Sequence, residues 1–245
     1  MKKSYSRFSV VGLAMLACQL VACGSEDPGS KVENDGGAGA GTGGGGSVIT
    51  EPLLPFKEGN TWTYRVTDGD EVFTKVNVIE GEEPVGGSGP NKDVLAHRVT
   101  TTKKDGTDKT VSWQKQEGNV VLRYREQSFA KGDGALNLEE HWTPHRLRVD
   151  SSPEHTTAGA SWLESYDETK LPVGGTPSTA PRRDRWTVQE TGATVTVPAG
   201  TFDDAIVLVK SGTSTQKTYW FVPGVGKVKE TGGQVEELVS YEVEP

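Results

Sequence analysis

Apolar and polar residues alternate with a period of two along much of the chain after position 50. In residues 61–67, Trp62, Tyr64 and Val66 fall on one face, a pattern typical of a half-buried strand. Asp68-Gly69-Asp70 predicts a turn and residues 72–79 the returning strand. By the same pattern we expect further strands at residues 94–102, 109–116, 119–127, 135–142, 161–166, 183–190, 193–197, 205–210, 215–222, 226–230 and 234–242.

The predicted fold class is all-β. No window keeps an apolar period of 3.6 for ten residues, and residues 51–245 hold 23 Val and 24 Thr against 11 Leu and 9 Ala. Short turns, among them one predicted at Thr191-Gly192, require antiparallel neighbours. About 12 such strands predict a strongly curled antiparallel sheet, a half-barrel or a barrel, with a β-sandwich as the alternative.

Six tryptophans are spread over the predicted strands, roughly one to a hairpin. They suit the core of a domain with few other large apolar residues. They equally suit an aromatic-lined concavity for a hydrophobic ligand. The sequence leaves both readings open for Trp62, Trp113, Trp142, Trp162, Trp186 and Trp220.

The N-terminus has the pattern of an export signal. Residues 1–7 are basic and residues 8–17 form an uncharged apolar run, which is too short to span a bilayer of about 30 Å. The run leads into Leu20-Val21-Ala22-Cys23, with an aliphatic residue at −3, a small one at −1 and then a thiol. This phrase resembles the lipobox of bacterial lipoproteins.

The lipobox resemblance implies that residues 1–22 are removed and that Cys23 carries the lipid. Cys18 is the rival acceptor, but Met15-Leu16-Ala17-Cys18 matches the lipobox less well. Two or three acyl chains make a lasting anchor, so a membrane is the expected partner. Enterobacterial lipoproteins kept at the inner membrane have aspartate after the lipidated cysteine, and Gly24 stands there in this chain. The resemblance therefore favours the outer membrane over the inner membrane.

Residues 23–50 hold the lipidated cysteine and a glycine-rich linker. No apolar strand precedes its glycine run and no Lys-Ser/Thr follows, so a phosphate-binding loop is disfavoured and a flexible tether is the better interpretation. The chain is thus divided into a signal peptide at 1–22, the tether at 23–50 and one β-rich domain at 51–245.

Two sequence motifs near the C-terminus resemble those of a second family. Residues 197–202 read V-P-A-G-T-F, and residues 220–229 fit W-F-x-P-G-V-G-x-V-K. They resemble a family of bacterial exported β-domains of uncharacterised function. Physically, Pro198 ends a strand, Gly200 permits a positive φ, and Pro223-Gly224 begins a turn.

Charge and cysteine content exclude several classes of function. The formal net charge is −8, which disfavours nucleic acid as a partner. Both cysteines precede the linker, so residues 51–245 have neither a disulfide nor a thiolate metal site.

No catalytic site is predicted, because the sequence has no Gly-x-Ser-x-Gly or His-Glu-x-x-His motif. His141 and His145 are the closest pair of metal-type ligands, but on a strand they would lie about 13 Å apart. We therefore expect no metal, no cofactor and no enzyme activity. The leading hypothesis is a non-catalytic lipoprotein that binds an envelope protein or has a structural role. The alternatives are a carrier of a lipid or lipoprotein acyl chain, and a carboxylate- or metal-dependent hydrolase.

Overall fold

The computed structural model describes residues 49–245, apart from residues 107, 214 and 245. Cys23, the signal and most of the tether lie outside this part. The described chain is almost entirely β-strand, with two 3-10 helices, η1 (Lys104–Gly106) and η2 (Pro153–His155). Its strands are β1 (Thr61–Asp68), β2 (Glu71–Pro84), β3 (Leu95–Lys103), β4 (Asp108–Glu117), β5 (Val120–Phe129), β6 (Leu136–Asp150), β7 (Ser161–Pro172), β8 (Ser178–Val197), β9 (Gly200–Gly212), β10 (Lys217–Val222), β11 (Gly226–Thr231) and β12 (Val235–Glu242).

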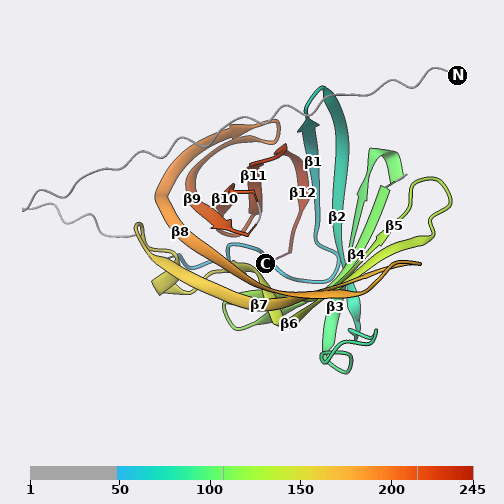
Figure 1. The fold of residues 1–245 in the computed structure, drawn as a ribbon. Helices are drawn as coiled ribbons and strands as arrows, with labels where there is room; N and C mark the ends of the chain where they lie inside the picture. The colour runs from blue at the N-terminus through green and yellow to red at the C-terminus, as the bar shows by residue number, and fades with distance from the viewer. Residues whose placement is uncertain (1–48, 107, 214, 245) are drawn as a thin grey trace, which may run out of the picture. The chain divides into compact units, whose positions relative to one another are not determined.

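The strands form a closed antiparallel barrel, which confirms the all-β prediction (Figure 1). Each strand pairs with its neighbours in the chain, and β12 returns to β1 with Thr61 opposite Glu242 and Thr67 opposite Val235. The curled sheet therefore closes on itself and does not divide into the two sheets of a sandwich.

The alternating pattern located the strands but not all of their ends. The strands predicted at 135–142 and 161–166 are longer in the structure, where β6 continues to Asp150 and β7 to Pro172. Trp62, Tyr64 and Val66 are buried on one face of β1, as expected. Residues 183–190 and 193–197 were predicted to be two strands, but they belong to the single strand β8. The turn predicted at Thr191-Gly192 is wrong. Gly192 has a φ of +71°, and the pairing with β9 shifts register there, so the positive φ produces a bulge within one strand.

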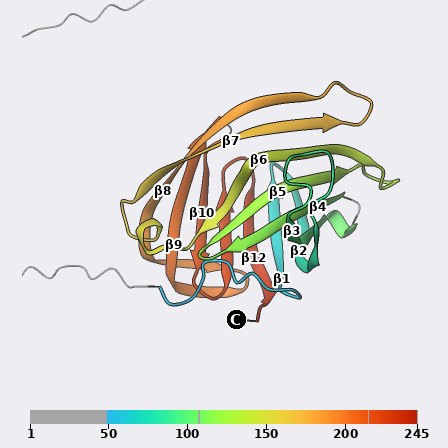
Figure 2. The same ribbon diagram turned by 90° about the horizontal axis from the view of Figure 1, so that it is seen from below.

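The segment before β1 closes one end of the barrel (Figure 2). The amide of Leu53 donates to Ser151 Oγ at 3.0 Å, and the amide of Gly224 donates to the carbonyl of Pro52 at 2.9 Å. The Leu53 side chain is fully buried, and Phe56 packs against the core as well. Leu53, Leu54 and Phe56 of this segment form the apolar end of the barrel interior, and we call them the apolar floor.

The pairing between β6 and β7 covers only part of their length. Their ladder runs from Leu138 opposite Pro172 to Thr143 opposite Asp167. Beyond that point the Glu164 carboxylate accepts a hydrogen bond from the amide of Leu147 and bridges the two strands. A side chain thus takes the place of ladder hydrogen bonds in this stretch of the wall.

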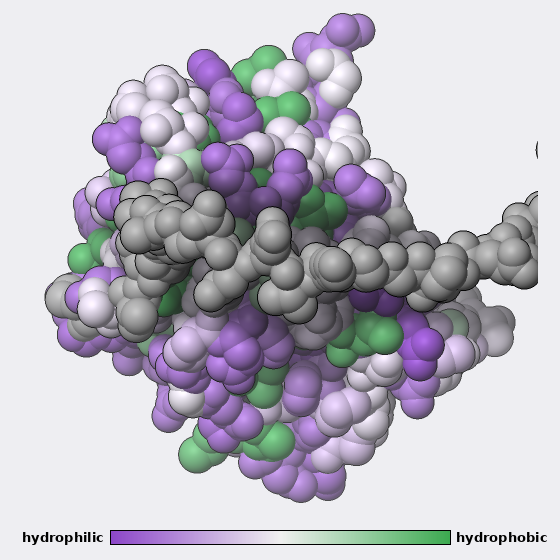
Figure 3. All heavy atoms as spheres, turned by 90° about the vertical axis from the view of Figure 1, so that its left-hand side faces the viewer, coloured by the Kyte–Doolittle hydropathy of each residue, from purple (hydrophilic) through white to green (hydrophobic). Residues whose placement is uncertain are grey.

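The outer surface shows scattered apolar residues. The face that looks left in Figure 1 is mostly hydrophilic (Figure 3). The large apolar side chains that are exposed come from different elements, including Val72 of β2, Leu163 of β7 and Tyr241 of β12. No helix within the described residues is long and apolar enough to cross a membrane.

Candidate ligand-binding cavity

A cavity of about 300 Å³ lies inside the barrel. This volume is at the lower end of the range for small-molecule sites, roughly 300–1,000 Å³. Its lining comes from the segment before β1 and from strands around the barrel, among them β1, β2, β5, β6, β8 and β10. The cavity is therefore a property of the closed barrel as a whole.

One part of the lining is apolar and aromatic. Leu54 and Phe56 of the floor contribute to it, with Trp62 of β1 and Trp186 of β8. The indole of Trp62 donates to the carbonyl of Val225 at 2.7 Å, which fixes the ring in place. Of the six tryptophans, Trp62 and Trp186 line the cavity, and both are also buried in the core.

Much of the rest of the lining is polar or charged, and cations are in clear excess among the charged side chains. Among the described residues, eight lysines and arginines line the cavity against three glutamates. The chain as a whole has a formal net charge of −8. Positive charge is therefore concentrated inside an acidic protein. The eight cations are Lys75, Lys103, Arg123, Arg146, Arg148, Lys210, Lys217 and Lys227.

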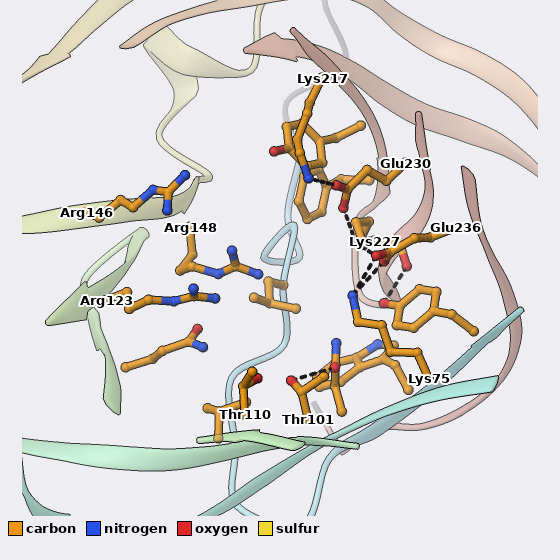
Figure 4. Close-up of a pocket in the computed structure, with 18 of the residues that line it drawn as sticks. Lys75, Thr101, Thr110, Arg123, Arg146, Arg148, Lys217, Lys227, Glu230 and Glu236 are labelled. Carbon is orange, nitrogen blue, oxygen red and sulfur yellow. Dashed lines mark hydrogen bonds and ion pairs between the residues drawn. The ribbon is translucent and has the colours of Figure 1, made fainter. Parts of the chain in front are cut away.

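Three of the lysines belong to an ion-pair network on one wall (Figure 4). Glu236 of β12 accepts from Lys75 and Lys227, each with its Nζ 2.7 Å from the carboxylate. Glu230 of β11 pairs with Lys227 and with Lys217. The side chain of Glu236 is only 2% exposed. We call these five residues the lysine–glutamate network.

The network keeps its carboxylates ionised. Burial alone would raise the pKa of Glu230, but attraction to Lys227 and Lys217 outweighs it and holds the pKa at about 2. The pKa of Glu236 is lowered for the same reason by Lys227 and Lys75. The cations of this wall are therefore largely neutralised within the protein.

The opposite wall carries three arginines that point into the cavity (Figure 4). Arg123 of β5 and Arg146 of β6 are register partners, and Arg148 lies two residues further along β6. Arg123 forms an ion pair with Glu126. The Nε atoms of Arg123 and Arg148 are buried and lack a hydrogen-bond partner among the described residues. We call Arg123, Arg146 and Arg148 the arginine triad.

A second set of buried charges lies beside the triad. Lys210 is 2.7 Å from Asp184 and 3.6 Å from Glu164, so it is neutralised. The guanidinium of Arg146 lies near two aromatic rings, 5.6 Å from the centre of the Trp142 ring and 5.9 Å from that of Tyr166. Asp184 of β8 is buried, whereas its neighbours Arg183 and Arg185 are exposed.

The structure brings His141 and His145 into different surroundings. His141 is buried and its Nε2 lies 2.8 Å from Glu139 Oε1, whereas His145 packs edge-on against Tyr124. In the part of the chain that the structure describes, no group of three or more His, Cys, Asp or Glu side chains could hold a metal ion.

Sequence reasoning did not find the arginine triad. Arg123 stands between Leu122 and Tyr124, and Leu147 separates Arg146 from Arg148. Alternation of this kind ordinarily places the charged face in solvent. Arg123 lies on the strand predicted at 119–127, but Arg146 and Arg148 lie beyond the end of the strand predicted at 135–142, so their position beside Arg123 was not predicted.

Two solved structures resemble this chain in fold, both at low sequence identity. The chain matches no protein-family model and no curated protein sequence. A Bacteroides fragilis protein described as exported and as having a YmcC-like fold is 12% identical, with a TM-score of 0.48. A Parabacteroides distasonis protein described as a lipoprotein is 11% identical, with a TM-score of 0.45. Each alignment covers 78% of this chain and 99% of the other.

Proposed function

We propose that the protein is a lipoprotein, anchored to the cell envelope through Cys23, whose barrel binds a small molecule in its interior without converting it. The observation that carries the proposal is the cavity of about 300 Å³ between an apolar floor and a charged wall. Binding sites of this kind combine apolar surface with a few convergent polar groups. The lipobox and the glycine-rich tether support the placement at a membrane, with the outer membrane favoured.

The charged lining favours an amphiphile over a purely hydrocarbon cargo. An acyl chain lying along Leu54, Phe56 and Trp62 would bury apolar surface. It would also cover the facing arginines and leave their donors without water, at a cost of a few kcal/mol for each unpaired charged group. A lipid or lipoprotein carrier is thus a reasonable function only if the cargo brings polar groups to the charged wall.

The buried carboxylates support binding over hydrolysis. A general acid that works near neutral pH needs a pKa raised toward 6–7, as in glycosidases. The pKa of Glu230 is instead held at about 2 by its lysine partners. The lysine–glutamate network is therefore suited to shaping the cavity and poorly suited to donating protons.

Filling the cavity tests the binding function. We expect the amphiphilic dye anilinonaphthalene sulfonate to fluoresce on binding to the full chain carrying Cys23→Ser, which requires no detergent. Adding Thr110→Trp places an indole in the cavity lining and should abolish that signal. If the proteins with and without Thr110→Trp are equally stable and give equal fluorescence, the dye binds outside the cavity. That result would contradict the cavity as the binding site.

Fractionation tests the anchor. Cys23→Ser should move the protein from the membrane pellet to the soluble fraction, because two or three acyl chains hold a protein at a bilayer effectively permanently. Cys18→Ser is the matched control and should stay in the pellet. A Cys23→Ser protein that remains with membranes would exclude Cys23 as the lipid attachment site.

A further inference from the structure

The arginine triad joins three like charges at the junction of two strands. Arg123 and Arg146 face each other directly in the antiparallel ladder between β5 and β6. Like charges directly opposite each other destabilise a sheet pair, by up to about 1 kcal/mol. Arg148 follows on the same strand, and Figure 4 shows all three guanidinium groups directed into the cavity. The fold alone gives no reason for this arrangement.

Internal carboxylates neutralise the triad only in part. Glu126 pairs with Arg123. Asp184 and Glu164 lie near Arg146, but both are within ion-pair distance of Lys210. In the described parts of the chain, neither Arg146 nor Arg148 has an ion pair within 4.0 Å of a carboxylate. The triad and Lys210 thus carry four positive charges against the three carboxylates of Glu126, Glu164 and Asp184, which leaves one positive charge without a nearby counter-charge.

The electrostatics of Arg123 agree with this geometry. Burial, with repulsion from Arg148 and Arg146, lowers its pKa to about 9, against the attraction of Glu126. Arginine side chains keep their charge in proteins at neutral pH. The buried Nε atoms of Arg123 and Arg148, which have no hydrogen-bond partner in the described part of the chain, add two donors at the same place.

We propose that the arginine triad binds an oxyanion group, a phosphate or a carboxylate, of the ligand held in the barrel. The guanidinium fork matches such groups geometrically, and charge-assisted hydrogen bonds to them are roughly twice as strong as neutral ones. The lysine–glutamate network across the cavity has its own carboxylates and does not compete for the anion. The ligand is then an anionic amphiphile with its apolar part on the floor, or a free oxyanion at the triad. This inference rests on the proposed function and specifies its ligand.

Matched probes that differ in one headgroup test the inference. Octyl phosphate, octanoate, octanol and inorganic phosphate are titrated into the full chain carrying Cys23→Ser, with the fluorescence of cavity residues Trp62 and Trp186 as the readout. At least one anionic octyl probe should bind ten-fold or more tightly than octanol. Inorganic phosphate that binds as tightly as octyl phosphate would identify a free oxyanion as the ligand, which still supports the triad.

Substitution of the triad locates the anion. Arg148→Gln should remove most of the preference for the anionic probe, a loss of ten-fold or more in affinity, while Arg148→Lys should retain part of it. Arg185→Gln, an outward-facing arginine, is the matched control and should leave every affinity unchanged. Thermal melting confirms that each variant is folded, and Arg123→Gln replaces Arg148→Gln if that variant does not fold.

The possible failures are distinguishable. If octanol binds as tightly as the anionic octyl probes, or if Arg148→Gln keeps the full preference, the triad is not the anion site, although the cavity still binds a ligand. If none of the four probes binds, both the triad and the proposed function are overturned.

Discussion

Lys227 of β11 and Glu236 of β12 meet inside the barrel, with Nζ 2.7 Å from the nearest carboxylate oxygen and the glutamate side chain 2% exposed. Lys75 reaches the same carboxylate from β2, so the contact ties the last two strands to the second. Breaking a buried pair by removing one partner leaves an uncompensated charge and costs about 3–5 kcal/mol. Glu236→Gln should therefore lower the free energy of unfolding by about that amount in chemical denaturation.

The same network predicts loss of stability in acid. The pKa of Glu230 is about 2 in the folded protein, against an ordinary value of 4.5. Below pH 4.5 the unfolded chain binds a proton that the folded chain does not, so the stabilisation is complete above that pH and is lost as the pH falls toward 2. We expect the melting temperature to fall steeply over this window. In Glu230→Gln the slope should be shallower, and an unchanged slope would contradict the assignment.

The arginine triad should contribute little to stability without a ligand. Arg148→Gln removes a charge that repels its neighbours, so the free energy of unfolding should stay within about 0.5 kcal/mol of the parent or rise slightly. Lys227→Met, in the lysine–glutamate network, is the contrasting variant and should cost about 3 kcal/mol. If Arg148→Gln costs as much as Lys227→Met, the triad has a structural role.

Gly226, in the motif at residues 220–229, should tolerate no side chain. Its φ is +113°, and a Cβ there would lie 2.7 Å from Trp62 Nε1. This indole nitrogen donates a hydrogen bond to the Val225 carbonyl. Gly226→Ala should cost about 3 kcal/mol from strain and overpacking together. Gly224→Ala is the control, because that glycine also has a positive φ but its Cβ would meet nothing closer than 3.5 Å, and it should cost about 1 kcal/mol. Equal costs would remove the contact with Trp62 as the reason.

The sequence was informative about strands because period-two alternation reflects burial directly. It placed β1 and its buried face through Trp62, Tyr64 and Val66. It failed at Thr191-Gly192, since a glycine with positive φ serves a turn and a bulge equally well. The choice between a curled sheet and a closed barrel depended on the pairing of β1 with β12, a contact between the two ends of the domain that no local pattern encodes.

The cavity was harder to predict for the same reason. Arg123 and Arg146 are 23 positions apart, and only the register of β5 with β6 brings them together. Lys75 and Glu236 are farther apart still, joined by the closure of the barrel. Alternation indicates that a side chain points to one face, but it does not indicate whether that face meets solvent or an enclosed charged interior.

Native mass spectrometry of the full chain purified from its own cells tests the binding function most directly. We predict a population heavier than the covalently modified chain by the mass of one bound small molecule, which is released on collisional activation and is absent from Thr110→Trp. A parent protein that shows only its covalent mass under gentle conditions would contradict the claim that the barrel interior is a binding site.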